Sequence, residues 1–189
     1  MSGERAIQAK TGQAKISQPK AFQPKTIQPK LAWANKFQRP TAAQLMAQFG
    51  TKQLGQLVEA ARGELVGFGG VEEALSWQGV PWRWTFVYSM SRVAGLSPAL
   101  QHPLAYLIAD PQKPQVAVPL SGSMIETIPM RRLKRFVRDG ILHGRLVGEV
   151  HWPCWDFSAR SQLDEILDLV TRKYKFLVAA GKQPVAERV

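Results

Sequence analysis

A histidine and a cysteine three residues apart are the side chains best suited to chemistry in this sequence. His151 and Cys154 lie in the stretch His-Trp-Pro-Cys-Trp-Asp, and such a pair could supply two metal ligands or a thiol and its base. Zinc needs three or four ligands, however, and neither His102 nor His143 has a spacing that completes the set. We therefore predict no metal site, no cofactor and no catalytic residue here. Cys154 is expected to be a small buried side chain.

Lysine recurs every five residues near the start of the chain. The stretch from Gln8 to Lys30 reads QAKTGQAKISQPKAFQPKTIQPK, and a degenerate repeat, LAWANK, follows it. A period of five suits neither a helix nor a strand, and each of the three prolines restricts the residue before it to extended conformations. We expect residues 1–40 to form a disordered, solvated arm. Its repeat lysines are Lys10, Lys15, Lys20, Lys25, Lys30 and Lys36.

The positive charge of the protein is concentrated in this arm. Residues 1–40 contain eight basic residues and one acidic residue, a net charge of +7 out of +11, which leaves +4 for residues 41–189. Such asymmetry indicates a polyanion as partner, because each lysine that neutralises a phosphate releases counterions. Apolar residues of the arm, among them Phe22, Trp33 and Phe37, could stack on bases, enter a bilayer interface or dock on a protein. The simplest alternative is a solubilising linker without a ligand.

A second cationic cluster follows Pro129, in the sequence PMRRLKRFVRDG. Proline suits the first position of a helix and Gly140 suits its end, so we expect one helix between them. Its basic side chains would form either an ordinary solvated face or a surface that contacts phosphates together with the arm. No helix-turn-helix pattern accompanies it, so binding would be nonspecific. These residues are Arg131, Arg132, Lys134, Arg135 and Arg138.

Aromatic residues alternate in a stretch that begins at Pro81. The alternating residues are Trp82, Trp84, Phe86 and Tyr88. Period two is typical of a strand, so we expect one face of this strand to be aromatic. That face is most simply the core side of a sheet. Alternatively, Trp82 and Trp84 could line a ligand cleft together with His151.

Helices are expected at both ends of the domain. Thr41 is suited to cap a helix that ends at Gly50, and residues 51–65 have the apolar spacing of a second helix. The last helix is expected to begin at Ser161, with a capping box of the type Ser-x-x-Asp, and to end near Gly181.

Strands are expected between these helices. Residues 104–110 and 115–120 have strand character and are joined by a turn that contains two prolines. Pro119 predicts that the second strand either lies at the edge of the sheet or ends there. Residues 145–152 alternate in the same way and predict one further strand.

These elements together predict an α+β fold. We expect a twisted, mainly antiparallel sheet of about four or five strands, with helices packed on one face. The predicted organisation is a disordered basic arm (residues 1–40), a single domain (residues 41–181) and a frayed tail (residues 182–189).

The order of elements resembles the small bacterial α+β domains of the YdhG-like group. A helix after Pro40-Thr41 is followed by the aromatic strand from Pro81, by the strand Leu104-Ala-Tyr-Leu-Ile, by a helix led by a proline and by a final helix. The resemblance covers about residues 40–180 and implies a twisted antiparallel sheet with helices on one face. Some members of that group are regarded as frataxin-like iron-handling proteins with acidic surfaces. The helices of this chain are basic and its acidic residues are scattered, so the resemblance implies no iron handling and no catalytic residue here.

Taken together, the sequence favours a non-enzymatic binding protein. A single cysteine fits a reducing compartment, and no secretory signal or apolar run of membrane-spanning length is present, so we expect the protein to be cytoplasmic. The leading hypothesis is nonspecific association with nucleic acid or another polyanion through the arm and the basic helix. The alternatives are a small-molecule binding or enzymatic domain with an aromatic cleft, and an adaptor whose arm binds an acidic protein.

Overall fold

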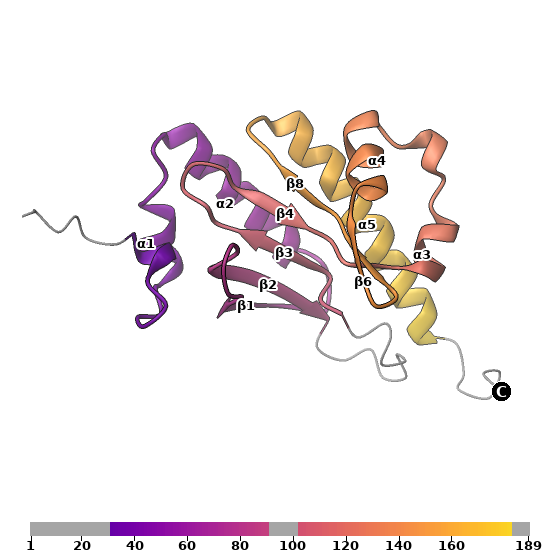
Figure 1. Ribbon diagram of the computed structural model, residues 1–189, viewed down its shortest axis with the longest axis horizontal. Helices are drawn as coiled ribbons and strands as arrows, with labels where there is room; N and C mark the ends of the chain where they lie inside the picture. Colours follow the sequence, from indigo (N-terminus) through magenta and orange to yellow (C-terminus); the bar gives the residue numbers. More distant parts are fainter. Residues whose placement is uncertain (1–30, 91–101, 183–189) are drawn as a thin grey trace, which may run out of the picture.

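The computed structural model of the chain describes residues 31–90 and 102–182. These residues form a five-stranded antiparallel sheet, a small three-stranded sheet and helices packed on the large sheet (Figure 1), which confirms the predicted α+β class. The α-helices are α1 Ala42–Met46, α2 Lys52–Val66, α3 Gly122–Thr127, α4 Arg135–Leu142 and α5 Arg160–Lys182, and the 3₁₀ helices are η1 Ala32–Ala34 and η3 Met130–Arg132. The strands are β1 Val71–Trp77, β2 Trp84–Met90, β3 Ala105–Ile108, β4 Gln115–Ala117, β5 Leu120–Ser121, β6 Arg145–Val147, β7 Val150–Trp152 and β8 Cys154–Asp156.

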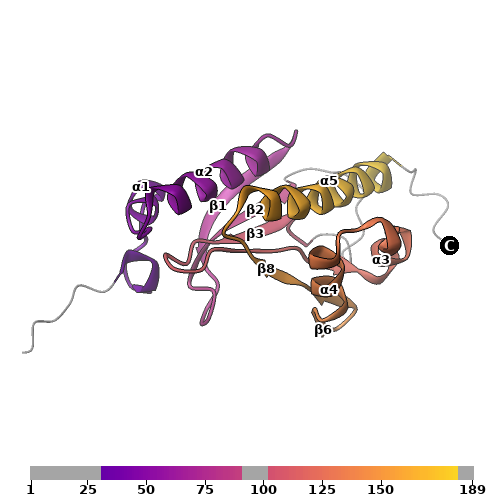
Figure 2. The same ribbon diagram turned by 90° about the horizontal axis from the view of Figure 1, so that it is seen from above.

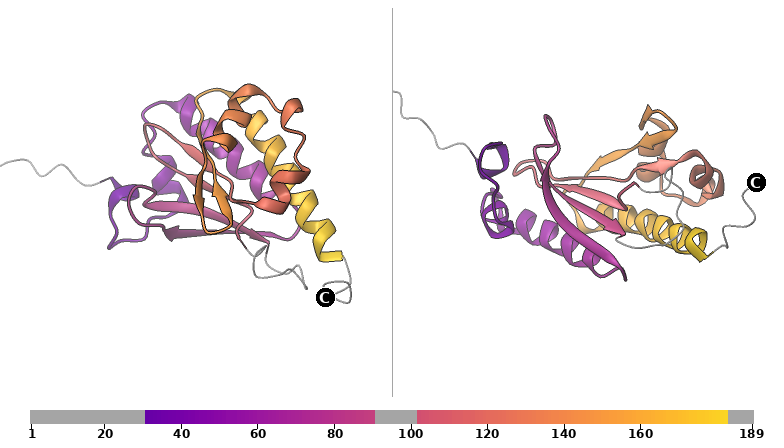
Figure 3. Two further views of the ribbon diagram at one scale, coloured as in Figure 1. Left: turned by 45° about the vertical axis from the view of Figure 1, so that its right-hand side comes forward. Right: turned by 90° about the horizontal axis from the view of Figure 1, so that it is seen from below.

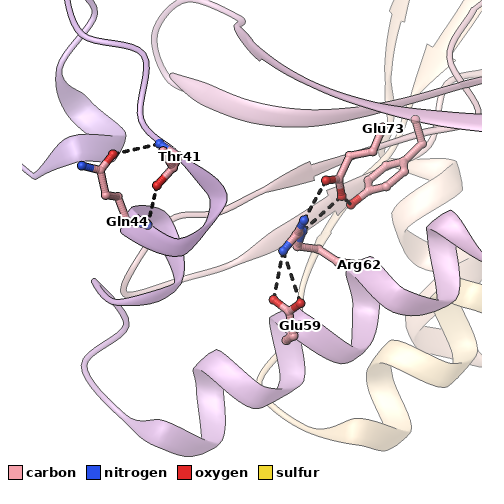
Figure 4. A network of polar contacts seen from close by, with 6 residues as sticks. Thr41, Gln44, Glu59, Arg62 and Glu73 are labelled. Carbon is pink, nitrogen blue, oxygen red and sulfur yellow. Dashed lines mark hydrogen bonds and ion pairs between the residues drawn. The ribbon is translucent and has the colours of Figure 1, made fainter.

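Threonines determine where the first two helices begin. The Thr41 hydroxyl accepts a hydrogen bond from the Gln44 backbone N–H, and the Gln44 side chain accepts one from Thr41 N–H (Figure 4). This capping box confirms Thr41 as the predicted N-cap. Helix α1 ends at Met46, earlier than the predicted Gly50, and Thr51 then caps α2.

Strand β1 is an edge strand that the sequence pattern did not predict. Its neighbour is β2, and Glu73 lies opposite Tyr88 in their register. A carboxylate at an inward position interrupts the apolar alternation by which strands are recognised. The structure satisfies Glu73 with two hydrogen bonds from Arg62 of α2 and one from the Tyr88 hydroxyl (Figure 4).

The two sheets are parts of one antiparallel ladder. The pairing of β4 with β8 and the pairing of β5 with β7 follow one continuous register. Between these pairs, the Val118 N–H donates to the Pro153 carbonyl at 3.1 Å. Pro119 and Pro153 have no N–H to donate, so regular strand pairing is interrupted at both positions. Strand β4 ends at Ala117, which confirms the predicted effect of Pro119.

Helices α2 and α5 lie beside each other over one face of the large sheet (Figure 2). The Arg62 guanidinium of α2 lies 4.6 Å from the ring centroid of Phe86, so this residue's face of β2 is the helix-covered face. Most side chains of the core between these layers are apolar. It includes Leu57, Val58, Leu65, Phe86, Leu107, Val116, Leu163, Ile166 and Val170.

Two predicted strands have different limits in the structure. Strand β2 begins at Trp84, so Trp82 belongs to the preceding turn and not to the strand. Residues 145–152 form the hairpin β6–β7 and not one strand (Figure 3). Its turn is Gly148-Glu149, and Gly148 has a φ of 61°, which glycine adopts without strain. Val147 and Val150 are cross-strand partners on either side of it.

The single helix predicted between Pro129 and Gly140 is divided into two helices in the structure. The chain forms the short 3₁₀ helix η3 and then α4, which continues through Gly140 to Leu142. A Cβ atom at position 140 would lie 1.8 Å from Trp155 Nε1. Gly140 is therefore present because an indole ring packs against the helix, not because the helix ends there.

The last helix begins one residue earlier than predicted, at Arg160, and contains Gly181. The predicted capping box at Ser161 is wrong. The Gln162 side chain instead accepts hydrogen bonds from the backbone N–H groups of Ser158 and Ala159. Residues 183–189, most of the predicted frayed tail, lie outside the described residues.

The ordered domain begins before residue 41. Residues 1–30 of the predicted arm lie outside the described residues, but residues 31–40 pack against the domain. Trp33 is 6% exposed and belongs to the core, and the carbonyl of Asn35 accepts a hydrogen bond of 2.7 Å from the Trp84 indole. The prediction of disorder up to residue 40 is therefore corrected: residues 31–40 are part of the fold.

Candidate polyanion surface and aromatic pocket

Two segments carry the predicted cationic cluster. Arg131 and Arg132 lie in η3, Lys134 is the residue before α4, and Arg135 and Arg138 lie in α4. We call these five residues the basic surface. All except the half-buried Arg138 are exposed.

The charges of the basic surface are not equally available. Arg135 and Arg138 both lie within ion-pair distance of Asp139, at 3.2 and 3.9 Å. Arg131, Arg132 and Lys134 form no ion pair with any residue that the structure describes. Of the basic surface, these three side chains are therefore the most available to bind an external anion.

Acidic residues of α5 lie close to part of this surface. Arg132 and Lys134 border a cavity of about 290 Å³ that Asp164, Glu165 and Asp168 also line. Asp164 and Asp168 are paired with arginines of their own helix, Arg160 and Arg172, at 2.7 and 2.9 Å. The helix thus keeps two of its three carboxylates occupied, which limits how far they offset the basic surface.

Of the repeat lysines, Lys36 is described, and its side chain is exposed. The other five, Lys10, Lys15, Lys20, Lys25 and Lys30, lie outside the described residues.

The predicted ligand cleft is divided between the two faces of the sheet. Trp84 is 8% exposed and lies edge-on to Trp77, with ring centroids 5.8 Å apart. It belongs to the helix-covered face, because it alternates in phase with Phe86. Trp82 contacts Tyr106 instead, with centroids 5.2 Å apart. Trp84 is therefore a core residue, and Trp82 and Trp84 do not line one cleft.

On the other face of the sheet, Trp82 joins a cluster of rings. Trp152 lies 6.0 Å from Trp82, 5.7 Å from Tyr106 and 5.9 Å from His102, measured between ring centroids. Tyr106 is buried, and this burial raises the pKa of its phenol. Neither Trp152 nor His102 belongs to the ligand cleft predicted from the sequence. Alternation along one strand could not predict these contacts, because the rings belong to segments that are far apart in the sequence.

A cavity of about 910 Å³ lies beside this cluster, and we call it the aromatic pocket. His151, Trp152 and His102 line it together with Ser121, Ser123 and the β6–β7 hairpin. His151 is thus at the pocket, as the alternative hypothesis requires, but Trp84 is not. The lining residues are aromatic, apolar and polar, and they include the acidic Glu149, a composition found at small-molecule sites.

Cys154 is exposed, and the expectation of a buried thiol is wrong. It lies in β8 of the large sheet, whereas His151 lies in β7 of the small one. Although the residue as a whole is exposed, neighbouring atoms partly desolvate its sulfur. This desolvation, and the charge of Asp156 second, raise the pKa of the thiol to about 12. A thiol with this pKa is almost fully protonated at neutral pH and is a weak nucleophile. Within residues 31–90 and 102–182, no group of three His, Cys, Asp or Glu side chains could hold a metal ion.

Two buried polar groups have structural explanations. Burial and the neighbouring carboxylate of Glu73 raise the pKa of the Tyr88 phenol, which therefore remains a hydrogen-bond donor. Lys173 of α5 is 4% exposed and donates to the carbonyls of Pro103 and Leu104 at 2.6 and 3.1 Å. Burial lowers the pKa of the Lys173 amine well below its ordinary value. The two carbonyls accept hydrogen bonds from the amine and so partly replace the water that burial removes.

Comparison of the chain with family models, with curated proteins and with solved structures finds no match. The resemblance to the YdhG-like group remains a prediction. In the part of the chain that the structure describes, no helix is long and apolar enough to span a membrane.

Proposed function

We propose that this protein binds nucleic acid, or a polyanion of similar charge density, without sequence specificity. Two regions would supply the contacts: the lysine repeats of residues 1–30 and the basic surface. The observation that carries the proposal is the cluster of three exposed cations, Arg131, Arg132 and Lys134, without ion-pair partners among the described residues. The concentration of charge in the lysine repeats supports it independently.

Arginine is the side chain best suited to this role, because its planar guanidinium matches the geometry of a phosphate. Helix α4 has only eight residues and follows a 3₁₀ helix, so no long recognition helix accompanies the cations. Contacts of this kind fix a protein on a phosphate backbone but do not read bases. The expected binding is therefore governed by charge and is strongly weakened by salt.

The test is a salt titration of binding to duplex DNA by the full chain and three variants. Deletion of residues 1–30 should remove most of the affinity. Replacement of Arg131, Arg132 and Lys134 by glutamine should lower the slope of log K against log salt by roughly 0.9 for each lost phosphate contact. The matched control replaces Arg135 and Arg138, which already share Asp139, and should change the slope less. Equal slopes for the full chain and the triple variant would contradict a role for the basic surface.

A second candidate function rests on the aromatic pocket. Its volume of about 910 Å³ is that of a small-molecule site, and Trp152 of the β6–β7 hairpin contributes an aromatic ring beside His102. We propose it as the alternative: a domain that binds a small ring compound. Titration with a library of uncharged aromatic and heterocyclic compounds, followed by tryptophan fluorescence, tests it. A response that is lost in Trp152→Leu supports the pocket.

A further inference from the structure

Phe37 is the most exposed large apolar side chain of the described residues, at 92%. It lies in a short loop, residues 35–39, which we call the Phe37 loop. Lys36 and Arg39 are also exposed, and neither forms an ion pair within residues 31–90 and 102–182. An aromatic ring is thus presented to solvent between two cations.

The Phe37 loop is anchored on both sides. Before it, Trp33 is buried in the core, its ring lies 4.5 Å from the Arg83 guanidinium and its backbone N–H donates to the Gln48 side chain at 3.2 Å. After it, Pro40 is buried, and the capping box of Thr41 begins α1.

The loop is also held from within. The Asn35 carbonyl accepts the indole N–H of Trp84 at 2.7 Å, and the Asn35 side chain accepts the backbone N–H of Phe37 at 3.2 Å. The backbone beneath the exposed ring is therefore fixed by the core of the domain. A fixed loop loses less conformational entropy on binding than a mobile one.

We propose that Phe37 is a stacking platform for the bases of single-stranded nucleic acid, with Lys36 and Arg39 placed for the flanking phosphates. Cationic side chains combined with an exposed aromatic ring are the elements by which proteins bind single strands without sequence preference. In a duplex the base faces are already stacked, so the ring has no equivalent partner there. This inference rests on the proposed function and adds to it a preference for single strands.

The experiment compares the full chain with Phe37→Ala and Phe37→Leu on three probes: single-stranded oligothymidylate, a duplex of equal length and heparin. Both variants should bind the single strand about tenfold more weakly, the change expected for the loss of one stacked base. Binding to the duplex and to heparin should be unchanged. Leucine keeps the apolar bulk but removes the π face, so retained binding in Phe37→Leu would overturn stacking.

Controls distinguish a failure of the stacking proposal from a failure of the proposed function. Val80 is 80% exposed in another loop, and Val80→Ala should leave all three affinities unchanged. Because the Phe37 ring makes little contact with the fold, its variants should unfold at the same temperature as the full chain. If the full chain binds all three probes and Phe37→Ala binds them equally well, the stacking platform is refuted and the proposed function stands. If the full chain binds none of them at low salt, both are refuted.

Discussion

Gly140 lies in the middle of α4, where the indole of Trp155 occupies the space of a side chain. The indole N–H donates to the Phe136 carbonyl at 3.3 Å, so the ring is held on the helix surface by a hydrogen bond as well as by packing. Glycine is unfavourable in a helix interior unless the space is needed. Here the close approach of helix and strand explains it.

Gly140→Ala should therefore destabilise the protein by about 1–3 kcal/mol, because the new methyl group must displace the Trp155 indole. The measurement is the free energy of unfolding in urea. Gly63→Ala in α2 is the matched control, since no heavy atom lies within 4 Å of a Cβ there. It should stabilise the protein by about 0.5–1 kcal/mol. Equal effects at the two positions would contradict the packing described for Trp155.

Lys173 makes stability depend on pH. Its folded-state pKa is lowered from 10.5, so the unfolded chain binds more protons in the interval between the folded-state pKa and 10.5. Stability from this residue is thus present at high pH and is lost as the pH falls through that interval, with a limit of about 1.4 kcal/mol per pH unit for one proton. We expect the difference in unfolding free energy between the full chain and Lys173→Met to increase with pH there. A constant difference would show that Lys173 titrates normally in the fold.

At the scale of elements, polar contacts decide how α2 lies on β1. Arg62 donates to both Glu73 and Glu59, with N···O distances of 2.7 and 3.0 Å for the two ion pairs (Figure 4). The side chains of Arg62 and Glu73 are 17% and 20% exposed, so the pair is largely shielded from water. Removing one partner of such a pair lowers the stability of the protein, because the remaining charge is shielded from water and uncompensated.

Arg62→Met should for this reason cost roughly 3 kcal/mol or more, because it leaves Glu73 with the Tyr88 hydroxyl alone. The double variant Arg62→Met with Glu73→Gln should recover part of this loss, since no unpaired charge remains. Thermal unfolding of the full chain and the variants measures both effects. If the double variant is as unstable as the sum of the single ones, the two residues are not coupled.

At the scale of the whole molecule, the first described residues pack against the beginning of β2, about fifty residues later in the sequence. The indole of Trp84 in β2 donates to Asn35, and Arg83 lies over Trp33, so η1 closes the end of the sheet (Figure 1). The fold therefore includes residues 31–40, which precede the predicted boundary at residue 41.

Two truncations test this boundary. Deletion of residues 1–30 should leave the melting temperature unchanged, because it retains the buried Trp33 and the hydrogen bond between Asn35 and Trp84. Deletion of residues 1–40 also removes Trp33 from the core and should destabilise the domain by about 3–5 kcal/mol. Circular dichroism during heating compares the two, and equal melting temperatures would place residues 31–40 outside the fold.

Local patterns were sufficient for the elements whose residues act within one turn or one strand. The capping threonine Thr41, the apolar face of α2 and the alternation from Trp84 onward determined elements that the structure contains, because hydrogen bonds and side-chain periodicity of this kind are local. The α+β class followed from their order. The prediction that Arg131, Arg132 and Lys134 face solvent agrees with their exposure in the structure.

Only the tertiary structure decided the rest, and the reason in each case is a partner distant in sequence. Glu73 is compatible with an inward position in β1 because Arg62 and Tyr88 lie opposite it. Trp82 and Trp84 are separated because the strand begins between them, and Trp152, seventy residues later in the sequence, contacts Trp82. Residues 31–40 belong to the fold because Trp33 finds room in a core formed by later elements. Local composition carries no information about such long-range contacts.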